Sequence, residues 1–337
     1  MKRIIFAVFF MALALLVSCS TDVDLFADYK EVPIIYGLLD YNADTNFIKI
    51  THAIEGGDNA LISANNPDLN NYHEKLDVRI TEFRNGDSIR QIVLDTITIH
   101  NKQDGLFYAP AQKLYYTTEP LCKNAPGIHY TYRLTVVLPE QTLVTNAAIV
   151  GSDRYSIRST VADFSGGTKN ILFQPAENAG VYDATMSFTF LERRTFDSDS
   201  VPRTVKWHMG TYFDTDLVQH TYDGAYVIKY HRNDLYEALG NFIGDDTLVP
   251  GLRRYLTDYP IEVTITAGGQ NLSQYLIYNG TEYTSMNPGN SYSGIDGGYG
   301  VFSSKSTRTQ KMRLGGTTVP ELVNDTKWGF KYIGGDL

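Results

Sequence analysis

The chain has 337 residues, of which 43% are hydrophobic and 20% are charged, and its formal net charge at pH 7 is −9. This apolar fraction can form a packed core, and it excludes a chain that is disordered throughout. The acidic balance argues against a nucleic-acid-binding protein. The lack of a basic run argues against electrostatic attachment to an anionic membrane, because both kinds of binding depend on clustered Lys and Arg.

The start of the chain has the pattern of an export signal. Lys2 and Arg3 precede a run of fourteen uncharged residues, 4–17. A positive start followed by an apolar segment is typical of a signal peptide. Since a helix needs about 20 apolar residues to cross a bilayer, this run is too short for a lasting membrane span. We therefore predict an exported protein with a signal peptide over residues 1–18.

The end of this segment, residues 16–19 (Leu-Val-Ser-Cys), resembles the lipobox of bacterial lipoproteins. The resemblance implies cleavage after Ser18, lipid on Cys19 and a tether over residues 19–30. Each buried methylene contributes about 0.8 kcal/mol, so two or three acyl chains anchor a protein stably. The alternative is an ordinary cleaved signal peptide with a chance Cys. Acidic residues in the tether resemble the surface-export signal of Bacteroidetes-type lipoproteins, and a plain solvated tether is the other interpretation.

The second cysteine, Cys122, has no partner within the chain once Cys19 carries lipid, because the sequence contains two Cys. An intramolecular disulfide is therefore not expected, although exported proteins often carry them. We predict that Cys122 is a small buried apolar residue, with a stray thiol as the alternative.

Residues 31–150 are expected to form short strands separated by turns. Hydrophobic and polar residues alternate as in half-buried strands, and Asn85-Gly86 is typical of a hairpin turn. The long segment 56–72 does not have a strand pattern and is expected to be an insertion. The expected strands cover residues 32–40, 46–54, 76–83, 89–98, 130–138 and 142–150.

The segment 126–136 resembles the penultimate strand of an immunoglobulin-like sandwich. In that fold a Tyr near the start of the strand bonds back to the preceding corner, and Tyr130 and Tyr132 are the candidates here. About seven strands in this length fit the same fold. We therefore predict a mainly β protein whose residues 31–150 form an immunoglobulin-like β-sandwich.

The second half is expected to be another β-rich domain. The polar segment 151–168 is taken as a linker, and residues 169–337 as the domain. Asp234 with Glu237 indicates a capped helix start, so we predict helices near residues 234–243 and 272–279. Alternation predicts strands over residues 182–190, 204–210 and 261–265.

Three stretches together resemble an uncharacterised family of Bacteroidetes-type cell-envelope lipoproteins. They are residues 27–39, the strand 47–50, and the glycine-containing closure 300–304 (Gly-Val-Phe-Ser-Ser). The resemblance covers nearly the whole mature chain. It implies a fold and a location at the outer membrane, in some members beside nutrient-uptake transporters, but no chemistry.

No catalytic, metal-binding or cofactor-binding site is predicted. Residues 289–294 approach a nucleophile elbow around Ser291, but the pattern is Gly-x-Ser-x-Ser without an expected strand-to-helix turn. His208, His220 and His231 lack the close spacing of a zinc site. The glycines around Tyr299 are not followed by the Lys and helix of a phosphate loop. An enzyme is therefore not expected.

Tyrosine is the residue type with a binding character, since the chain contains 24 of them. Tyr offers an apolar ring with a polar tip, which suits half-buried surfaces and ligand stacking. The segment from Tyr283 through Tyr292 to Tyr299 is the candidate contact for a glycan or peptide ligand or for a partner. The alternative is that Tyr simply suits strands and sheet edges.

These observations predict a lipid-anchored cell-envelope protein, periplasmic or surface-facing, with a binding or accessory role that includes association with an outer-membrane nutrient-uptake system. A glycan hydrolase is the first alternative, and it would need two facing carboxylates in a cleft. A pilus or adhesin subunit is the second, and it would need an incomplete sheet that accepts a strand.

Overall fold

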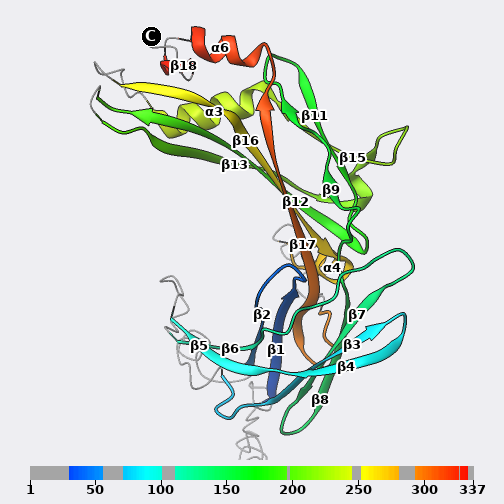
Figure 1. Cartoon of the computed structure of the whole chain (residues 1–337). Coiled ribbons are helices and arrows are strands. Elements are labelled where there is room, and N and C mark those ends of the chain that lie inside the picture. The colour runs from blue at the N-terminus through cyan, green and yellow to red at the C-terminus, as the bar shows by residue number, and fades with distance from the viewer. Residues whose placement is uncertain are drawn as a thin grey trace, which may run out of the picture.

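The computed structural model describes residues 30–55, 71–100, 111–195, 198–244, 252–280, 293–325 and 327–332. These residues form mainly β-strands, which are gathered into two bodies, one above the other in Figure 1. Cys19 and the signal segment lie outside the described residues. The first body contains β1 (Lys30–Leu39), β2 (Asn46–Glu55), β3 (Asp77–Arg84), β4 (Asp87–Val93), β5 (Asp95–Ile99), β6 (Gln112–Thr117), β7 (Tyr130–Val137) and β8 (Thr142–Ala148).

The first body is a sandwich with immunoglobulin topology. One sheet has the strand order β1-β2-β6-β5 and the other β4-β3-β7-β8. These orders correspond to strands A-B-E-D and C′-C-F-G of the immunoglobulin fold. Alternating side chains from both sheets, such as Ile48, Val78 and Leu134, are fully buried between them. The mainly β fold predicted from the sequence is therefore confirmed.

Tyr132 fixes the corner before the penultimate strand, β7. Its side chain is fully buried, and its hydroxyl accepts a hydrogen bond from the backbone N–H of Cys122 at 2.7 Å. This is the bond that the resemblance implied for a Tyr near the start of the strand. Cys122 itself is half-buried rather than fully buried. Burial, with the neighbouring Glu82 carboxyl, raises the pKa of its thiol.

One predicted strand is two strands in the structure. The segment 89–98 was expected to be continuous, but β4 and β5 belong to different sheets. The chain changes sheet at Leu94, whose side chain is buried in the core and whose N–H donates to the carbonyl of Val78 at 2.9 Å. A local alternation pattern does not show to which sheet each half of such a segment belongs.

The second body packs two sheets and two helices around one core. Its larger sheet has the order β13-β12-β16-β17, and its smaller sheet β14-β15-β11-β9. The strands are β9 (Ser156–Ile157), β10 (Val161–Ala162), β11 (Thr168–Gln174), β12 (Ala179–Arg193), β13 (Val201–Phe213), β14 (Val218–Gln219), β15 (Tyr226–His231), β16 (Arg253–Gly269), β17 (Tyr299–Leu314) and β18 (Phe330–Tyr332). The helices are α3 (Arg232–Ile243), α4 (Gln270–Asn279), α6 (Thr318–Asn324) and the short 3-10 helix η2 (Asp214–Asp216).

The two predicted helices are present as α3 and α4. At the start of α3 the Asp234 carboxylate accepts a hydrogen bond from the backbone N–H of His231 at 2.7 Å. At its end the N–H of Gly244 donates to the carbonyl of Gly240, and Gly244 has a φ of 64°. The helix therefore ends where the sequence predicted, because this backbone conformation favours glycine. The sequence analysis did not predict α6.

Strand β17 joins the two bodies. Its first part, Tyr299–Ser304, pairs in parallel with Ile34–Leu39 of β1, and its second part, residues 305–312, pairs antiparallel with residues 261–268 of β16. The side chain of Phe302 therefore lies in the core of the first body and that of Met312 in the core of the second. The expected domain 169–337 differs from the structure here, because residues 293–304 complete the first body.

This pairing also occupies the outer edge of β1. A pilus-like subunit would need a sheet edge left open for an incoming strand. In this chain the edge of the strand that corresponds to A in the immunoglobulin fold is filled by the chain's own β17.

A polar network at Arg308 fills the junction between the bodies. The guanidinium donates to the Tyr41 hydroxyl at 2.7 Å and to the carbonyl of Tyr155 at 3.0 Å. Ser304, also on β17, accepts from the N–H of Val150 at 2.9 Å and donates to the carbonyl of Ala148. The junction is thus held by hydrogen bonds from side chains to backbone and to the Tyr41 hydroxyl, which fix the angle between the bodies more closely than apolar contact alone.

A substitution at Gly300 tests the parallel pairing of β17 with β1. Its φ is +107°, and a Cβ built there would lie 2.0 Å from the carbonyl oxygen of Ile35 on β1. We expect Gly300→Ala to lower the free energy of unfolding by at least about 2 kcal/mol, because both the left-handed backbone and the parallel pairing are lost. The matched control is Gly316→Ala, where a Cβ meets nothing within 4 Å. Urea unfolding measures both, and equal stabilities for the two variants would contradict the pairing.

Candidate functional site

The most irregular point of the large sheet is a four-residue bulge in β16. Phe188 of β12 pairs with Ile261 and Phe190 pairs with Leu256, so residues 257–260 stand opposite the single residue Thr189. Pro260, the last residue of the bulge, has no N–H to donate to a neighbouring strand. Bulges of this kind redirect side chains and are frequent beside functional sites.

The neighbour of β16 changes across the bulge. On one side Ile261 pairs with Met312 of β17, and on the other Leu256 pairs with Tyr332 of β18. A groove of about 530 Å³ opens between the end of β17, β18 and α6. We call it the α6 groove, and its lining residues are Leu256, Thr257, Asp258, Arg313, Leu314, Val319 and Tyr332.

A second groove lies on the other side of the bulge, over the outer face of the sheet. Its volume is about 460 Å³, and most of its lining side chains carry hydroxyl or charged groups. We call it the threonine groove, and it is lined by Ser187, Thr189, Thr204, Thr257, Asp258, Tyr259, Pro260, Glu262 and Lys311. The hydroxyls of Thr189 and Thr204 are 2.9 Å apart and hydrogen-bonded. Thr257 and Asp258 line both grooves.

Tyr259 and Arg313 form an exposed pair at the same point. The Arg313 guanidinium donates to the Tyr259 hydroxyl at 3.0 Å, and its carbon lies 5.1 Å from the centre of the Tyr259 ring. The Tyr259 side chain is 49% exposed. The pair therefore holds an aromatic ring in place at the surface, where it can stack on a ligand.

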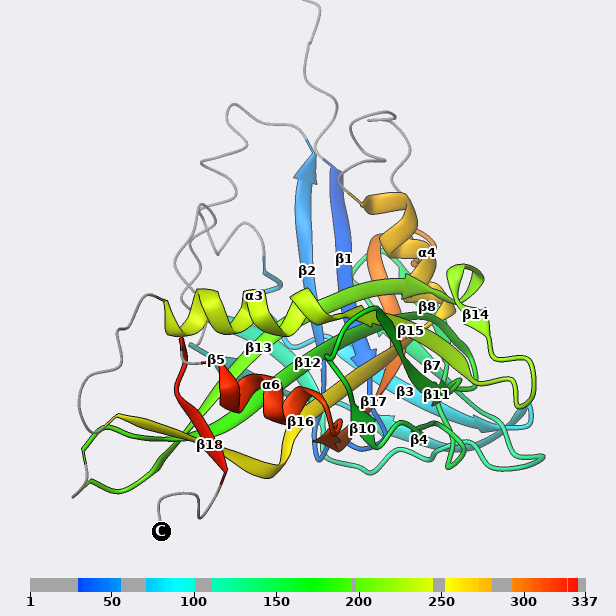
Figure 2. The ribbon, with the colours of Figure 1, turned by 90° about the horizontal axis from the view of Figure 1, so that it is seen from above.

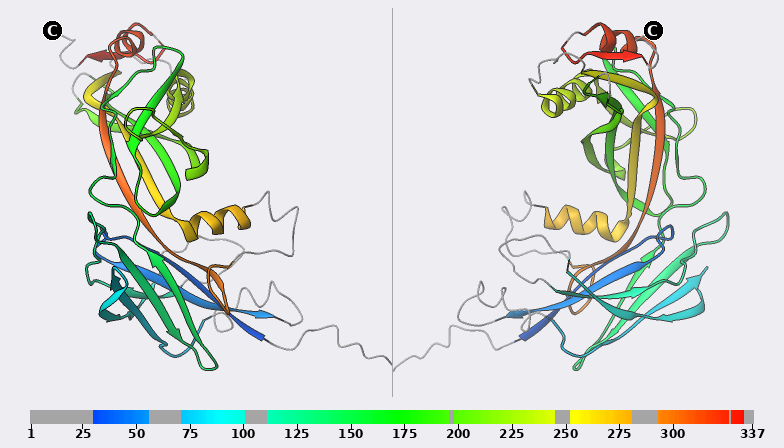
Figure 3. Two further views of the ribbon diagram at one scale, coloured as in Figure 1. Left: turned by 90° about the vertical axis from the view of Figure 1, so that its right-hand side faces the viewer. Right: turned by 60° about the vertical axis from the view of Figure 1, so that its left-hand side comes forward.

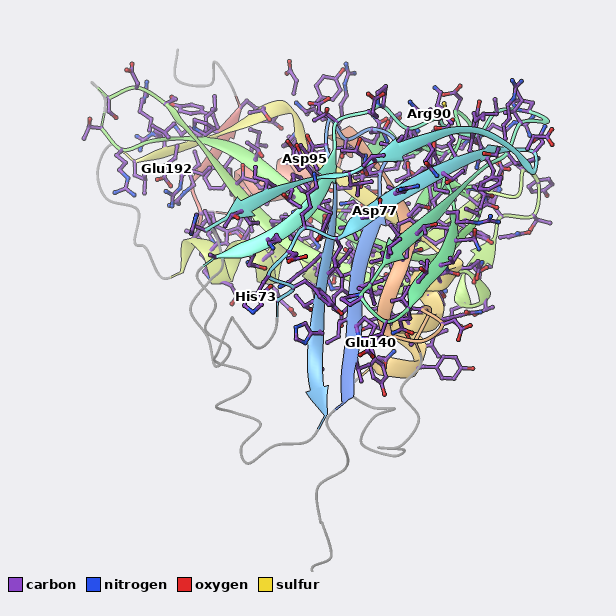
Figure 4. The ribbon with its side chains drawn as sticks, turned by 90° about the horizontal axis from the view of Figure 1, so that it is seen from below. His73, Asp77, Arg90, Asp95, Glu140 and Glu192 are labelled. Carbon is purple, nitrogen blue, oxygen red and sulfur yellow. The ribbon has the colours of Figure 1, made fainter. Side chains whose placement is uncertain are left out.

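The segments behind the grooves are held by buried polar contacts. Arg254 is 1% exposed, and its guanidinium donates to the Glu192 carboxylate at 3.1 Å and to the carbonyl of Trp328 at 2.9 Å. These bonds join β16 to β12 and to the segment that leads into β18. In Figure 4, Glu192 marks the end of the molecule that carries the bulge.

The wall formed by α6 is anchored at Asp163. Its carboxylate accepts hydrogen bonds from the N–H of Ser165 at 3.0 Å, from Lys169 at 2.9 Å and from the Thr318 hydroxyl at 3.0 Å. Thr318, the first residue of α6, is fully buried and also accepts from the N–H of Phe164. The hydrogen bonds from Ser165, together with those from Lys169 and Thr318, hold the pKa of the Asp163 carboxyl well below its usual range.

Of the tyrosines predicted from the sequence, the one that the structure describes, Tyr299, lines neither groove. Tyr283 and Tyr292 fall outside the described residues, as does Ser291. Tyr299 is 46% exposed and starts β17, whereas Arg313 lies fourteen residues further along the same strand. At about 3.3 Å per residue, the strand between them is up to roughly 45 Å long. The sequence analysis therefore missed the bulge, although a Pro inside a central strand is a recognised signal for one.

The three histidines considered for zinc each have a different partner. His208 contacts Asp183 at 2.7 Å, His220 contacts Asp223 at 3.1 Å, and His231 contacts Thr168 at 3.3 Å. Across the described ranges, no cluster of three or more His, Cys, Asp or Glu side chains could hold a metal ion.

The fold and the grooves define a class: a two-body β protein with an immunoglobulin-topology sandwich at one end and open polar grooves at the other. No family model matches the chain, and no curated protein matches it. In the part of the chain that the structure describes, no helix is both long and apolar enough to cross a membrane.

The low pKa of Asp163 predicts how stability depends on pH. Because the folded-state pKa is depressed, the carboxylate stabilises the fold above the ordinary Asp pKa, about 3.9, and loses this contribution as pH falls below it. Asp163→Asn should therefore be less stable than the unmodified chain at pH 7, and the difference should shrink toward pH 2. Urea unfolding at several pH values measures it. The exposed Asp44→Asn is the control, and a difference for Asp163→Asn that is constant with pH would contradict the assignment.

Proposed function

We propose that the mature protein is anchored by lipid on Cys19 in the outer membrane and binds an oligosaccharide in the grooves beside the β16 bulge. The observation that carries the proposal is the position of the bulge. It lies in the body that is farther from the start of β1, where the chain comes from Cys19 (Figure 1). An anchored protein would therefore hold these grooves away from its own membrane.

The lining of the two grooves suits a neutral ligand with many hydroxyl groups. Asp258 and Glu262 accept hydrogen bonds from sugar hydroxyls, Lys311 and Arg313 donate to ring and hydroxyl oxygens, and Tyr259 offers a stacking face. The grooves contain both charge signs side by side, so they do not select for a strongly anionic ligand. A peptide is the alternative ligand, and it would need backbone pairing or a deeper apolar pocket.

Hydrolysis of the glycan is the second candidate function, because Asp258 and Glu262 line the same groove. Glycosidases place two carboxyl groups about 5–10 Å apart, and one of them keeps its proton near neutral pH because it is buried. Asp258 is exposed and Glu262 lies on an open sheet face. This favours binding over catalysis.

Association with an outer-membrane uptake transporter rests on the family resemblance alone. Purification of the full chain from its membrane in mild detergent tests it. A transporter in the eluate would support the accessory role, and a bare monomer would count against it.

The anchor is tested by labelling. Cells fed labelled palmitate should incorporate the label into the unmodified chain and into Cys122→Ala, and Cys19→Ala should carry none. Cys122→Ala is the matched control because it removes the other thiol. Label on the Cys19→Ala chain, or its absence from all three, would remove the anchor from the proposal.

The groove is tested on the same chain by oligosaccharide-array screening followed by calorimetry. Asp258→Asn should weaken binding of the selected glycan about tenfold, because one charged hydrogen-bond acceptor is worth about 1.5–3 kcal/mol. Asp216→Asn, an exposed change in the same body that lines neither groove, should leave the affinity unchanged. Release of reducing sugar that stops in Asp258→Asn and Glu262→Gln would favour the hydrolase instead.

A further inference from the structure

Helix α4 has an unusual distribution of side chains for a surface helix. None of its ten residues is charged, and Ser273 is its one buried residue. Leu276, Ile277 and Tyr278, at the end of the helix, are 39%, 43% and 40% exposed. A helix that packs on a sheet usually turns its apolar residues inward. The end of α4 turns them outward.

Two strands add aromatic rings to the same surface. The Tyr36 hydroxyl on β1 is 3.2 Å from that of Tyr275 on α4, and the two rings meet edge to face with their centres 6.2 Å apart. Tyr299 pairs with Ile34 and therefore lies on the same outer face of the sheet as Tyr36. Both are exposed, at 42% and 46%. We call Tyr36, Leu276, Ile277, Tyr278 and Tyr299 the α4 patch.

The α4 patch carries no charge at neutral pH. Its members are Leu, Ile and Tyr. Burial, together with the bond to Tyr275, raises the pKa of Tyr36 to about 12. Lys49, which pairs across the strands with Tyr36, donates to Gln112 at 2.9 Å. Apolar side chains mixed with tyrosine are typical of surfaces that lie at a lipid headgroup boundary, where the ring is in the apolar layer and the hydroxyl in water.

The position of the patch points to the membrane as its occupant. The end of α4 and the start of β1 lie on the same side of the molecule in Figures 2 and 3. Residue 30, where β1 begins, is eleven residues from Cys19. Eleven extended residues span at most about 40 Å, so a lipid on Cys19 keeps the start of β1 within that distance of the bilayer. Figure 4, seen from below, shows Glu140 beside the blue strands β1 and β2, and Glu192 at the opposite end.

We propose that the α4 patch rests on the lipid bilayer and sets the orientation of the anchored protein. The placement rests on the proposed lipid anchor, but the contact itself is a property of the folded chain. An acyl anchor alone does not set the orientation of the folded chain, whereas a second contact through the patch fixes which side faces the membrane. Because the patch has no charge, binding is insensitive to salt and to the headgroup charge of the lipid.

The first experiment measures the contact without the anchor. The folded chain lacking lipid, as Cys19→Ala without the signal segment, is floated with phosphatidylcholine vesicles. Leu276→Asp with Ile277→Asp should lower its partition coefficient at least about tenfold, since each methylene that leaves the lipid costs about 0.8 kcal/mol. Val201→Asp with Val218→Asp, two exposed apolar residues of the second body, is the matched control and should change nothing. Both pairs are surface changes, and urea unfolding checks that each variant folds.

The second experiment measures orientation in the lipidated protein. Tyr299→Trp and Val218→Trp each add one reporter to the same two native Trp. Vesicles with brominated acyl chains should quench the added emission of Tyr299→Trp and not that of Val218→Trp, and the Leu276→Asp, Ile277→Asp pair should remove this quenching. Equal behaviour of the two reporters would overturn the proposal.

The two proposals fail in different ways. If the chain carries no palmitate label but its flotation still depends on the patch, the proposed anchor is wrong and the proposed membrane contact stands. If the chain carries the palmitate label but Tyr299→Trp is not quenched more than Val218→Trp, the proposed anchor stands and the proposed membrane contact is wrong. If the unlipidated chain ignores vesicles but dimerises, and the aspartate pair restores a monomer, the patch is an interface between copies and the membrane proposal is wrong.

Discussion

The structure depends on one strand that pairs in opposite senses along its length. The first part of β17 lies parallel to β1 and the second part antiparallel to β16, so a single ladder of hydrogen bonds runs through both bodies. Phe302 and Met312 lie at even positions of this strand and enter different cores. Neither body can move far against the other without breaking the strand's pairing on one side. Together with Arg308, this makes the spacing between the α4 patch and the grooves a fixed property of the fold.

The same strand shows why part of the fold could not be predicted from the sequence. In the first body the strands around Ile48, Val78 and Leu134 cross a single core, so their alternation is visible and they were found. Along β17 the inward positions between the two cores are Ser304, Ser306 and Arg308, whose side chains bond to backbone and to Tyr41. The hydrophobic period therefore disappears where the strand passes from one core to the other. Its partner β1 is more than 250 residues away, and no local pattern reports such a pairing.

The candidate site was missed for a different physical reason. Residue types with known chemistry, such as paired histidines or a nucleophile elbow, can be recognised in a sequence, and the lining residues of the grooves include neither. They form because the bulge that ends at Pro260 interrupts the ladder with β12, and because the other neighbour of β16 changes there from β17 to β18. Only the first cause, a proline within a strand, can be recognised in the sequence. The chain is rich in tyrosine, but Tyr299 lies beside α4 and not beside the bulge. The residue type alone therefore did not indicate to which surface this side chain belongs.

The two surfaces have opposite character, and the junction explains how both can coexist in one chain. A patch of Leu, Ile and Tyr would attract any apolar partner if it lay beside an open ligand groove. Separation along β17 prevents this, because the polar outer face of the second body, with hydrogen-bonded threonine pairs such as Thr264 and Thr309, lies between them. The threonines keep that face hydrated while their methyl groups still suit a strand. The sheet that joins the two bodies therefore also keeps the apolar α4 patch apart from the polar grooves. A rigid connection is needed for this, since a flexible linker at residues 151–168 would let the two surfaces approach each other.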